Sequence, residues 1–78
     1  MNAIHKARIE AGLSQTEVGA VIGRSSMWMS KVERGVTQVN AAVEAKILRA
    51  IEKLAHFRES VREHQMELAE ELRLPSPR

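Results

Sequence analysis

Residues that end helices and residues that start them alternate through the first half of the chain. Gly12 and Gly23 are each followed two residues later by a serine, Ser14 and Ser25, and Gly35 closes the series. Glycine readily takes the left-handed backbone that ends a helix, whereas a serine hydroxyl accepts hydrogen bonds from the first amides of the next helix. Because roughly ten residues separate successive breaks, this spacing predicts short helices joined by tight turns.

The residues between the first breaks have the apolar spacing of helices. Asn2 is suited to cap a first helix that runs from Ala3 to about Ala11. Ser14 and Glu17 form a Ser-x-x-Glu capping box that predicts the start of a second helix. The apolar residues expected to face the core from these two helices are Ile4, Ala7, Ala11, Val18, Val21 and Ile22.

A third helix is predicted between Ser25, its N-cap, and Gly35. Met29 and Val32 are expected to face inward. The residues on its other side are mostly polar: Ser26, Met27, Ser30 and Lys31, with Trp28 at the flank. Two short helices joined by a tight turn, the second with such an outer face, predict a helix-turn-helix whose second helix enters a DNA groove.

A much longer helix is predicted after Asn40, since no glycine or proline follows until Pro75. We expect it to run from Ala41 to about Leu74. The apolar residues that repeat every seven positions along it are Ile47, Leu54, Val61 and Leu68. The complementary positions of this repeat hold Ala50, Phe57, His64 and Glu71, and Leu72 shifts the stripe. The helix face formed by this repeat is therefore apolar in its first half and more polar in its second half.

Together these segments predict an all-α fold, namely a compact helix-turn-helix domain of about four helices with a long C-terminal helix. Residues 1–54 are expected to form the DNA-binding domain, residues 55–74 a helical extension and residues 75–78 a frayed tail. The extension has too little surrounding sequence to bury its apolar stripe, so we expect it to pair with its copy in a homodimer. The residues expected at the dimer interface are Leu54, Phe57, Val61, Leu68 and Leu72.

Composition excludes several classes of function. The 78 residues suffice for one small domain, and the absence of cysteine excludes disulfides and thiolate metal sites. No signal-peptide stretch is evident, and no apolar run approaches the roughly 20 residues that cross a bilayer. The chain also lacks a glycine-rich phosphate loop and a clustered pair of carboxylate and histidine. We therefore expect a cytoplasmic protein that is not an enzyme and needs no cofactor, metal or membrane.

The basic charge lies in the first half of the chain. Residues 1–40 hold five basic and three acidic side chains, whereas residues 41–78 hold seven of each. This excess is small for a protein that neutralises phosphates, and two copies acting together would double it.

The joint spacing of several short motifs resembles the lambda-repressor-like, or Cro-type, helix-turn-helix family, over about residues 3–51. The matching pieces are Arg8, Gly12-Leu13-Ser14-Gln15, Val18-Gly19, Ile22-Gly23, Ser25 and Met29-Ser30-Lys31-Val32-Glu33-Arg34-Gly35. The chain departs from the family at Gly19, where alanine is usual, and in residues 36–40, which lack the basic residue and the proline that the family often has there. A small residue at position 19 lets the two helices of the helix-turn-helix approach each other closely.

The resemblance implies double-stranded DNA as the partner. It places Ser14 and Gln15 at the DNA backbone, where the amides at the start of a helix favour phosphate oxygens. It matches Ser26, Met27 and Lys31 to positions that read base edges, and Lys31 suits the O6 and N7 atoms of guanine. The complete set of expected DNA-binding residues is Ser14, Gln15, Arg24, Ser25, Ser26, Met27, Trp28, Ser30, Lys31 and Arg34.

Two further expectations concern the packing around the third helix. The resemblance matches Arg8 and Glu33 to a buried ion pair between the first and third helices, which would hold the recognition helix in position. Trp28 has three equally weighted interpretations: it reaches DNA, it fills the groove between helices, or it lies at the dimer contact.

The function implied by the resemblance is transcriptional regulation. We expect a sequence-specific DNA-binding protein, a small dimeric repressor of phage or mobile-element type, that occludes an inverted-repeat operator with two recognition helices one helical turn apart. One alternative is an antitoxin or controller-type regulator whose C-terminal helix binds a second protein. Another is a protein-interaction adaptor that has kept the fold and lost DNA binding.

Overall fold

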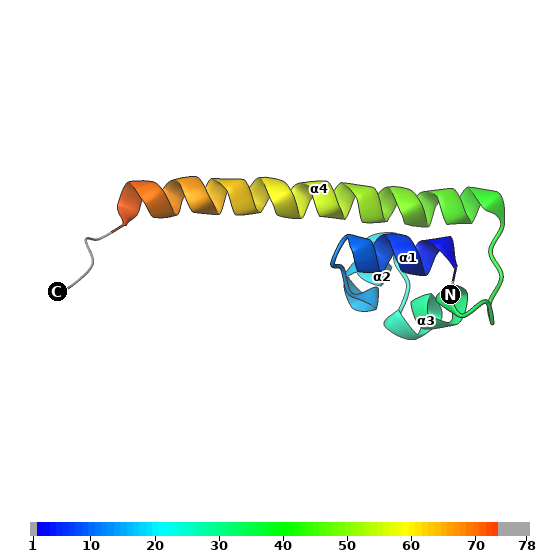
Figure 1. The fold of residues 1–78 in the computed structure, drawn as a ribbon. Coiled ribbons are helices and arrows are strands. Elements are labelled where there is room, and N and C mark those ends of the chain that lie inside the picture. Colours follow the sequence, from blue (N-terminus) through cyan, green and yellow to red (C-terminus); the bar gives the residue numbers. More distant parts are fainter. Residues whose placement is uncertain (1, 74–78) are drawn as a thin grey trace.

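The computed structural model describes residues 2–73, and within them all regular secondary structure is α-helical. Its four helices are α1 (Ala3–Glu10), α2 (Gln15–Ile22), α3 (Ser26–Glu33) and α4 (Ala41–Leu72). α1 and α2 pack against the first half of α4, and α3 lies on their side away from it, whereas the second half of α4 extends beyond the three short helices (Figure 1). The molecule is accordingly elongated, with extents of 57 × 23 × 19 Å. The expected fold class, all-α with a long C-terminal helix, is confirmed.

Each helix begins directly after the polar residue that the sequence indicated as its cap. The side chains of Asn2, Ser14, Ser25 and Asn40 all accept a hydrogen bond from a backbone amide in the first turn, at 2.8 to 3.1 Å. The capping box is complete, because the Glu17 carboxylate also accepts from the backbone amide of Ser14 at 3.0 Å. Local hydrogen bonds therefore fix all four helix starts.

The core is made of apolar side chains from all four helices and from the turn between α1 and α2. Its buried residues are Ile4, Leu13, Val18, Met29, Val32, Ile47 and Ile51. The expected place of Val21 in the buried stripe is wrong, since this side chain is 56% exposed. The buried face of α2 is centred on Val18, Gly19 and Ile22, and Val21 lies roughly 100° around the helix from that centre.

Gly19 lies where the backbone of the α2–α3 turn crosses α2. A Cβ atom built on this residue would lie 2.5 Å from the carbonyl oxygen of Arg24. The Arg24 amide also donates to the Gly19 carbonyl at 2.8 Å, and Gly23 between them has φ +74°. The turn is therefore tighter than an alanine at position 19 would allow.

The two halves of α4 differ in their surroundings. Ile47, Ala50 and Ile51 are buried beneath the short helices, whereas residues 61–73 are all exposed. The helix is continuous and ends at Leu72, slightly before the expected end near Leu74. That residue and the expected frayed tail, residues 75–78, lie outside the described residues.

Candidate nucleic-acid interface

The outer face of α3 carries the side chains expected to read bases. Ser26, Met27 and Lys31 are exposed, Met27 to 66%, and Ser30 is partly buried. The helix lies on the far side of the domain from α4 (Figure 1). Opposite this face, Met29 and Val32 point into the core and fix the rotation of the helix. The arrangement leaves the polar side of α3 open along its length.

A buried ion pair joins α1 to the end of α3. Arg8 Nε donates to Glu33 Oε2 at 2.7 Å, and Arg8 Nη2 donates to Glu33 Oε1 at 2.9 Å. The Glu33 residue is 1% exposed and Arg8 is 8% exposed. Arg8 Nη1 also donates to the carbonyl oxygen of Leu13 at 2.8 Å. The pair that the resemblance implied is therefore present and connects α1, the α1–α2 turn and α3.

Two further side chains reach the same carboxylate, and the sequence analysis missed both. His5 Nδ1 lies 2.7 Å from Glu33 Oε1, and Gln15 Nε2 donates to that oxygen at 3.5 Å. The signal for His5 was its spacing, because residues 5 and 8 lie one turn apart on the same face of a helix. Burial by itself raises the pKa of the Glu33 carboxyl, but the hydrogen bonds from Arg8 and His5 outweigh it, and the pKa is lowered.

The start of α2 offers fewer free groups than expected. The Ser14 hydroxyl already accepts from the Glu17 amide, and the partly buried Gln15 amide is turned toward Glu33. Hydrogen bonds from the backbone and side chain of Ser14 lower the pKa of the Glu17 carboxyl, which is therefore negatively charged at neutral pH. An anion at this helix end would meet the backbone amides of Gln15 and Thr16, which have no acceptor within the helix. From the side chains it would gain only the Ser14 hydroxyl proton and, after rotation, the Gln15 amide.

Trp28 packs within the domain. Its ring is partly buried against the core cluster, and the Arg24 guanidinium lies 5.3 Å from the ring centroid. This position corresponds to the second of its three interpretations, the groove between helices. The spacing of Arg24 and Trp28, four residues apart, is a signal that could have indicated their contact.

The remaining expected DNA-binding residues lie at the two ends of α3. The Ser25 hydroxyl caps the helix through the Trp28 amide, and Arg34 donates from Nε to the Ser30 carbonyl at 3.3 Å. Both residues are exposed. Three exposed basic side chains therefore accompany α3: Arg24 before it, Lys31 in its last turn and Arg34 at its C-cap.

The residues expected at a dimer interface lie along α4. Leu54 is partly buried by the domain, whereas Phe57, Val61, Leu68 and Leu72 are exposed by 65%, 37%, 54% and 67%. Within residues 2–73, no three histidine or carboxylate side chains gather into a group that could hold a metal ion. In the same range, no helix combines the length and apolar character needed to cross a membrane.

Comparisons with known proteins identify no relative of the chain. Neither the protein-family models, nor the curated proteins, nor the solved structures contain a match to the chain.

Proposed function

We propose that the chain is a sequence-specific double-stranded DNA-binding protein that regulates transcription in the cytoplasm. The observation that supports this most directly is the outer face of α3, where Ser26, Met27 and Lys31 project from a short helix. The buried Arg8–Glu33 pair holds that helix from behind. A rigid helix with an exposed polar face and adjacent basic side chains is the element that enters a major groove.

The chemistry of this face suits base edges. Lys31 can donate to guanine O6 and N7, Ser26 can donate or accept at any base, and Met27 can contact the methyl group of thymine. Arg24 and Arg34 are exposed at the two ends of α3. In this proposal they would contact phosphates on either side of the groove. In this proposal the base contacts give specificity and the flanking cations give affinity.

We propose further that the protein acts as a homodimer, a small repressor of phage or mobile-element type that occludes its operator. The exposed apolar residues of α4 support a dimer because such a stripe is normally covered. Two copies on an inverted repeat would double the modest basic excess of one domain.

The test is selection of bound fragments from random duplex DNA, followed by titration of Lys31→Ala on the selected site. We expect an inverted repeat and a loss of affinity of about 5- to 150-fold, which corresponds to about 1–3 kcal/mol for one good base contact. Lys46→Ala is the matched control, since this exposed lysine lies on α4, away from α3. No enrichment in the selection, or equal effects of the two variants, would exclude the proposal.

The exposed stripe of α4 also favours a second candidate, in which that helix binds a different protein, as in an antitoxin or controller-type regulator. A pull-down from the native host tests it. A stoichiometric foreign partner whose binding is lost in Leu68→Glu would support this candidate over the simple repressor. An adaptor without DNA binding would keep that partner and show no response to Lys31→Ala in any DNA assay.

A further inference from the structure

Three polar side chains, from the cap and one side of α1, all reach the last two residues of α3. Asn2, His5 and Arg8 follow one another at intervals of three residues, so they form one row along the helix. Asn2 Nδ2 donates to the carbonyl oxygen of Val32 at 2.7 Å, and His5 Nδ1 lies 2.7 Å from Glu33 Oε1. With the two hydrogen bonds from Arg8 to Glu33, these contacts join α1 to the end of α3. We call the three side chains the donor row.

The side chain of Asn2 serves two helices at once. Its Oδ1 accepts from the His5 amide at 3.1 Å, which caps α1, while its Nδ2 donates to Val32 in α3. Serine caps a helix about as well as asparagine, but a serine side chain has no counterpart of Nδ2. The contact with α3 is therefore a property of asparagine at this position and is separable from the cap.

The proton between His5 and Glu33 belongs to His5 Nδ1. Burial by itself raises the pKa of the Glu33 carboxyl, but the hydrogen bonds from Arg8 and His5 lower it, so at neutral pH the group is a carboxylate that only accepts. An unprotonated Nδ1 would bring two lone pairs within 2.7 Å of each other, and the nearest alternative donor, Arg8 Nη2, is 3.5 Å away. The short contact therefore requires a ring that is protonated at Nδ1.

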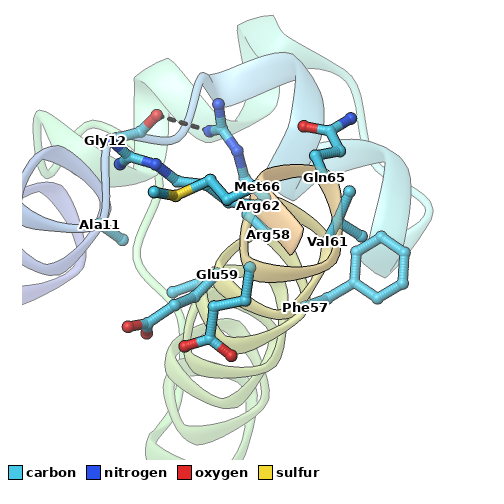
Figure 2. Close-up of a pocket in the computed structure, with 11 residues that line it drawn as sticks. Ala11, Gly12, Phe57, Arg58, Glu59, Val61, Arg62, Gln65 and Met66 are labelled. Atoms are coloured by element: carbon cyan, nitrogen blue, oxygen red, sulfur yellow. Dashed lines mark hydrogen bonds between the residues drawn. The ribbon is translucent and has the colours of Figure 1, made fainter. Parts of the chain in front are cut away.

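The opposite end of α1 is attached to α4. Arg58 Nη1 donates to the Gly12 carbonyl oxygen at 2.8 Å, just beyond the end of α1, and lies 3.6 Å from the Glu17 carboxylate. Figure 2 shows this hydrogen bond between α4 and the α1–α2 turn. The side chain of Ile4 also holds α1 in the core. Because α1 is fixed in this way, the donor row determines where the end of α3 lies relative to the rest of the domain.

We propose that Asn2 and His5 are positioning residues for the outer face of α3, acting through Val32 and Glu33 and not by contact with DNA. The inference rests on the proposed function for its relevance to DNA. Apolar core contacts have no preferred direction, whereas hydrogen bonds do, so the donor row adds the orientation that packing leaves open. Lys31, the proposed donor to guanine, belongs to the same last turn of α3. A displacement of this turn therefore moves the proposed base contact.

Four single substitutions in the full chain separate positioning from stability. Asn2→Ser keeps the cap of α1 and removes the donor to Val32. His5→Ala removes the donor to Glu33, and His5→Asn restores it, because Nδ2 of asparagine occupies the place of Nδ1 in histidine. Ile9→Ala is the control, an uncharged change at an exposed position of the same helix.

Each variant is titrated with a duplex enriched from random DNA and with a random duplex of the same length. A displaced α3 loses base contacts, which only the enriched duplex provides, whereas phosphate contacts are common to both. We expect Asn2→Ser and His5→Ala to lower the ratio of the two affinities by about 3- to 10-fold, as part of one base contact is lost. His5→Asn and Ile9→Ala should keep the ratio within about twofold.

A purely structural role would lower the folded fraction and weaken binding to both duplexes equally. Equal losses in Asn2→Ser and His5→Ala, or no loss in either, would overturn the proposal. The same holds if His5→Asn is as defective as His5→Ala, because the donor at this position would then have no part in the effect.

Nuclear magnetic resonance tests the contact without DNA. The nitrogen shifts of the His5 ring, assigned by comparison with His5→Ala, should show a proton on Nδ1, and a proton on Nε2 alone would overturn the proposal. The Glu33 amide should exchange its hydrogen faster in His5→Ala relative to the Ile51 amide of the core, and equal acceleration of both would indicate global destabilisation and overturn it. Failure of the DNA-binding proposal is distinguishable, because the selection would then enrich no duplex whatever the result for His5.

Discussion

Arg8 and Glu33 are joined by two hydrogen bonds of 2.7 and 2.9 Å, and this pair links α1 directly to the last residue of α3. Its position behind the outer face of α3 means that a change in the pair also moves the surface proposed to read DNA. Because both side chains are buried, neither charge has water as an alternative partner.

Replacing Arg8 with alanine is expected to destabilise the domain by about 3–5 kcal/mol, since the Glu33 carboxylate would remain buried without its cation. Thermal and urea unfolding followed by circular dichroism measure the loss. Arg49→Ala, an exposed arginine on α4, is the control and should change the free energy of unfolding by less than about 0.5 kcal/mol. Unchanged stability of Arg8→Ala would contradict the structural role of the pair.

The stability of the domain is expected to fall in acid because of Glu33. The pKa of its carboxyl is lower in the folded chain than its usual value of 4.5. A lowered folded pKa stabilises the fold fully above 4.5, and the contribution is lost as the pH falls from there through the folded pKa. Urea unfolding between neutral pH and about pH 3 measures this slope. Glu33→Gln should be less stable at neutral pH, and its free energy of unfolding should depend less on pH in the acid range. If that free energy fell as steeply with pH in the variant, a group other than Glu33 would be responsible.

Gly19→Ala tests the close crossing at the α2–α3 turn. Alanine gains about 1 kcal/mol in helix propensity, but its Cβ would lie 2.5 Å from the backbone oxygen of Arg24. We expect the clash to exceed the gain, with a net destabilisation of about 1–3 kcal/mol by urea unfolding. Thr16→Ala on the same helix is exposed and should be neutral or slightly stabilising. A stabilised Gly19→Ala would mean that the turn opens freely.

Arg24→Ala is expected to weaken DNA binding without changing the preferred sequence. The Arg24 guanidinium lies over the Trp28 ring beside α3. On the proposed function it would contact a phosphate from there. Loss of one phosphate contact should reduce the slope of log affinity against log salt by about 1. Titrations at several salt concentrations, on selected and random duplexes, measure both quantities. A change in sequence preference would assign Arg24 to base recognition instead.

Much of the fold was predictable because its signals are local. Asn2, Ser14, Ser25 and Asn40 each cap the helix that the sequence indicated, and each cap depends on atoms within three residues. The inward positions of Met29 and Val32 followed from helical periodicity for the same reason. Periodicity failed at Val21, because the direction from which the neighbouring helices approach decides which arc of α2 is buried.

The candidate site was predictable only in part. The exposed face of α3 followed from its polar residues, whereas the inward turn of Gln15 and the approach of His5 to Glu33 depend on α1, α2 and α3 meeting at one carboxylate. The packing of Trp28 against the core likewise depends on neighbours that its place in the sequence does not reveal.

The amino-acid sequence by itself determined where the helices begin and end and which side of α3 is polar, because caps and periodicity act over a few residues. Only the tertiary structure decided what surrounds Glu33, how closely the α2–α3 turn crosses Gly19, and where the domain stops covering α4 at its Arg58 link to Gly12. These features join residues distant in the chain, and their energies depend on distances that arise only once the helices have packed.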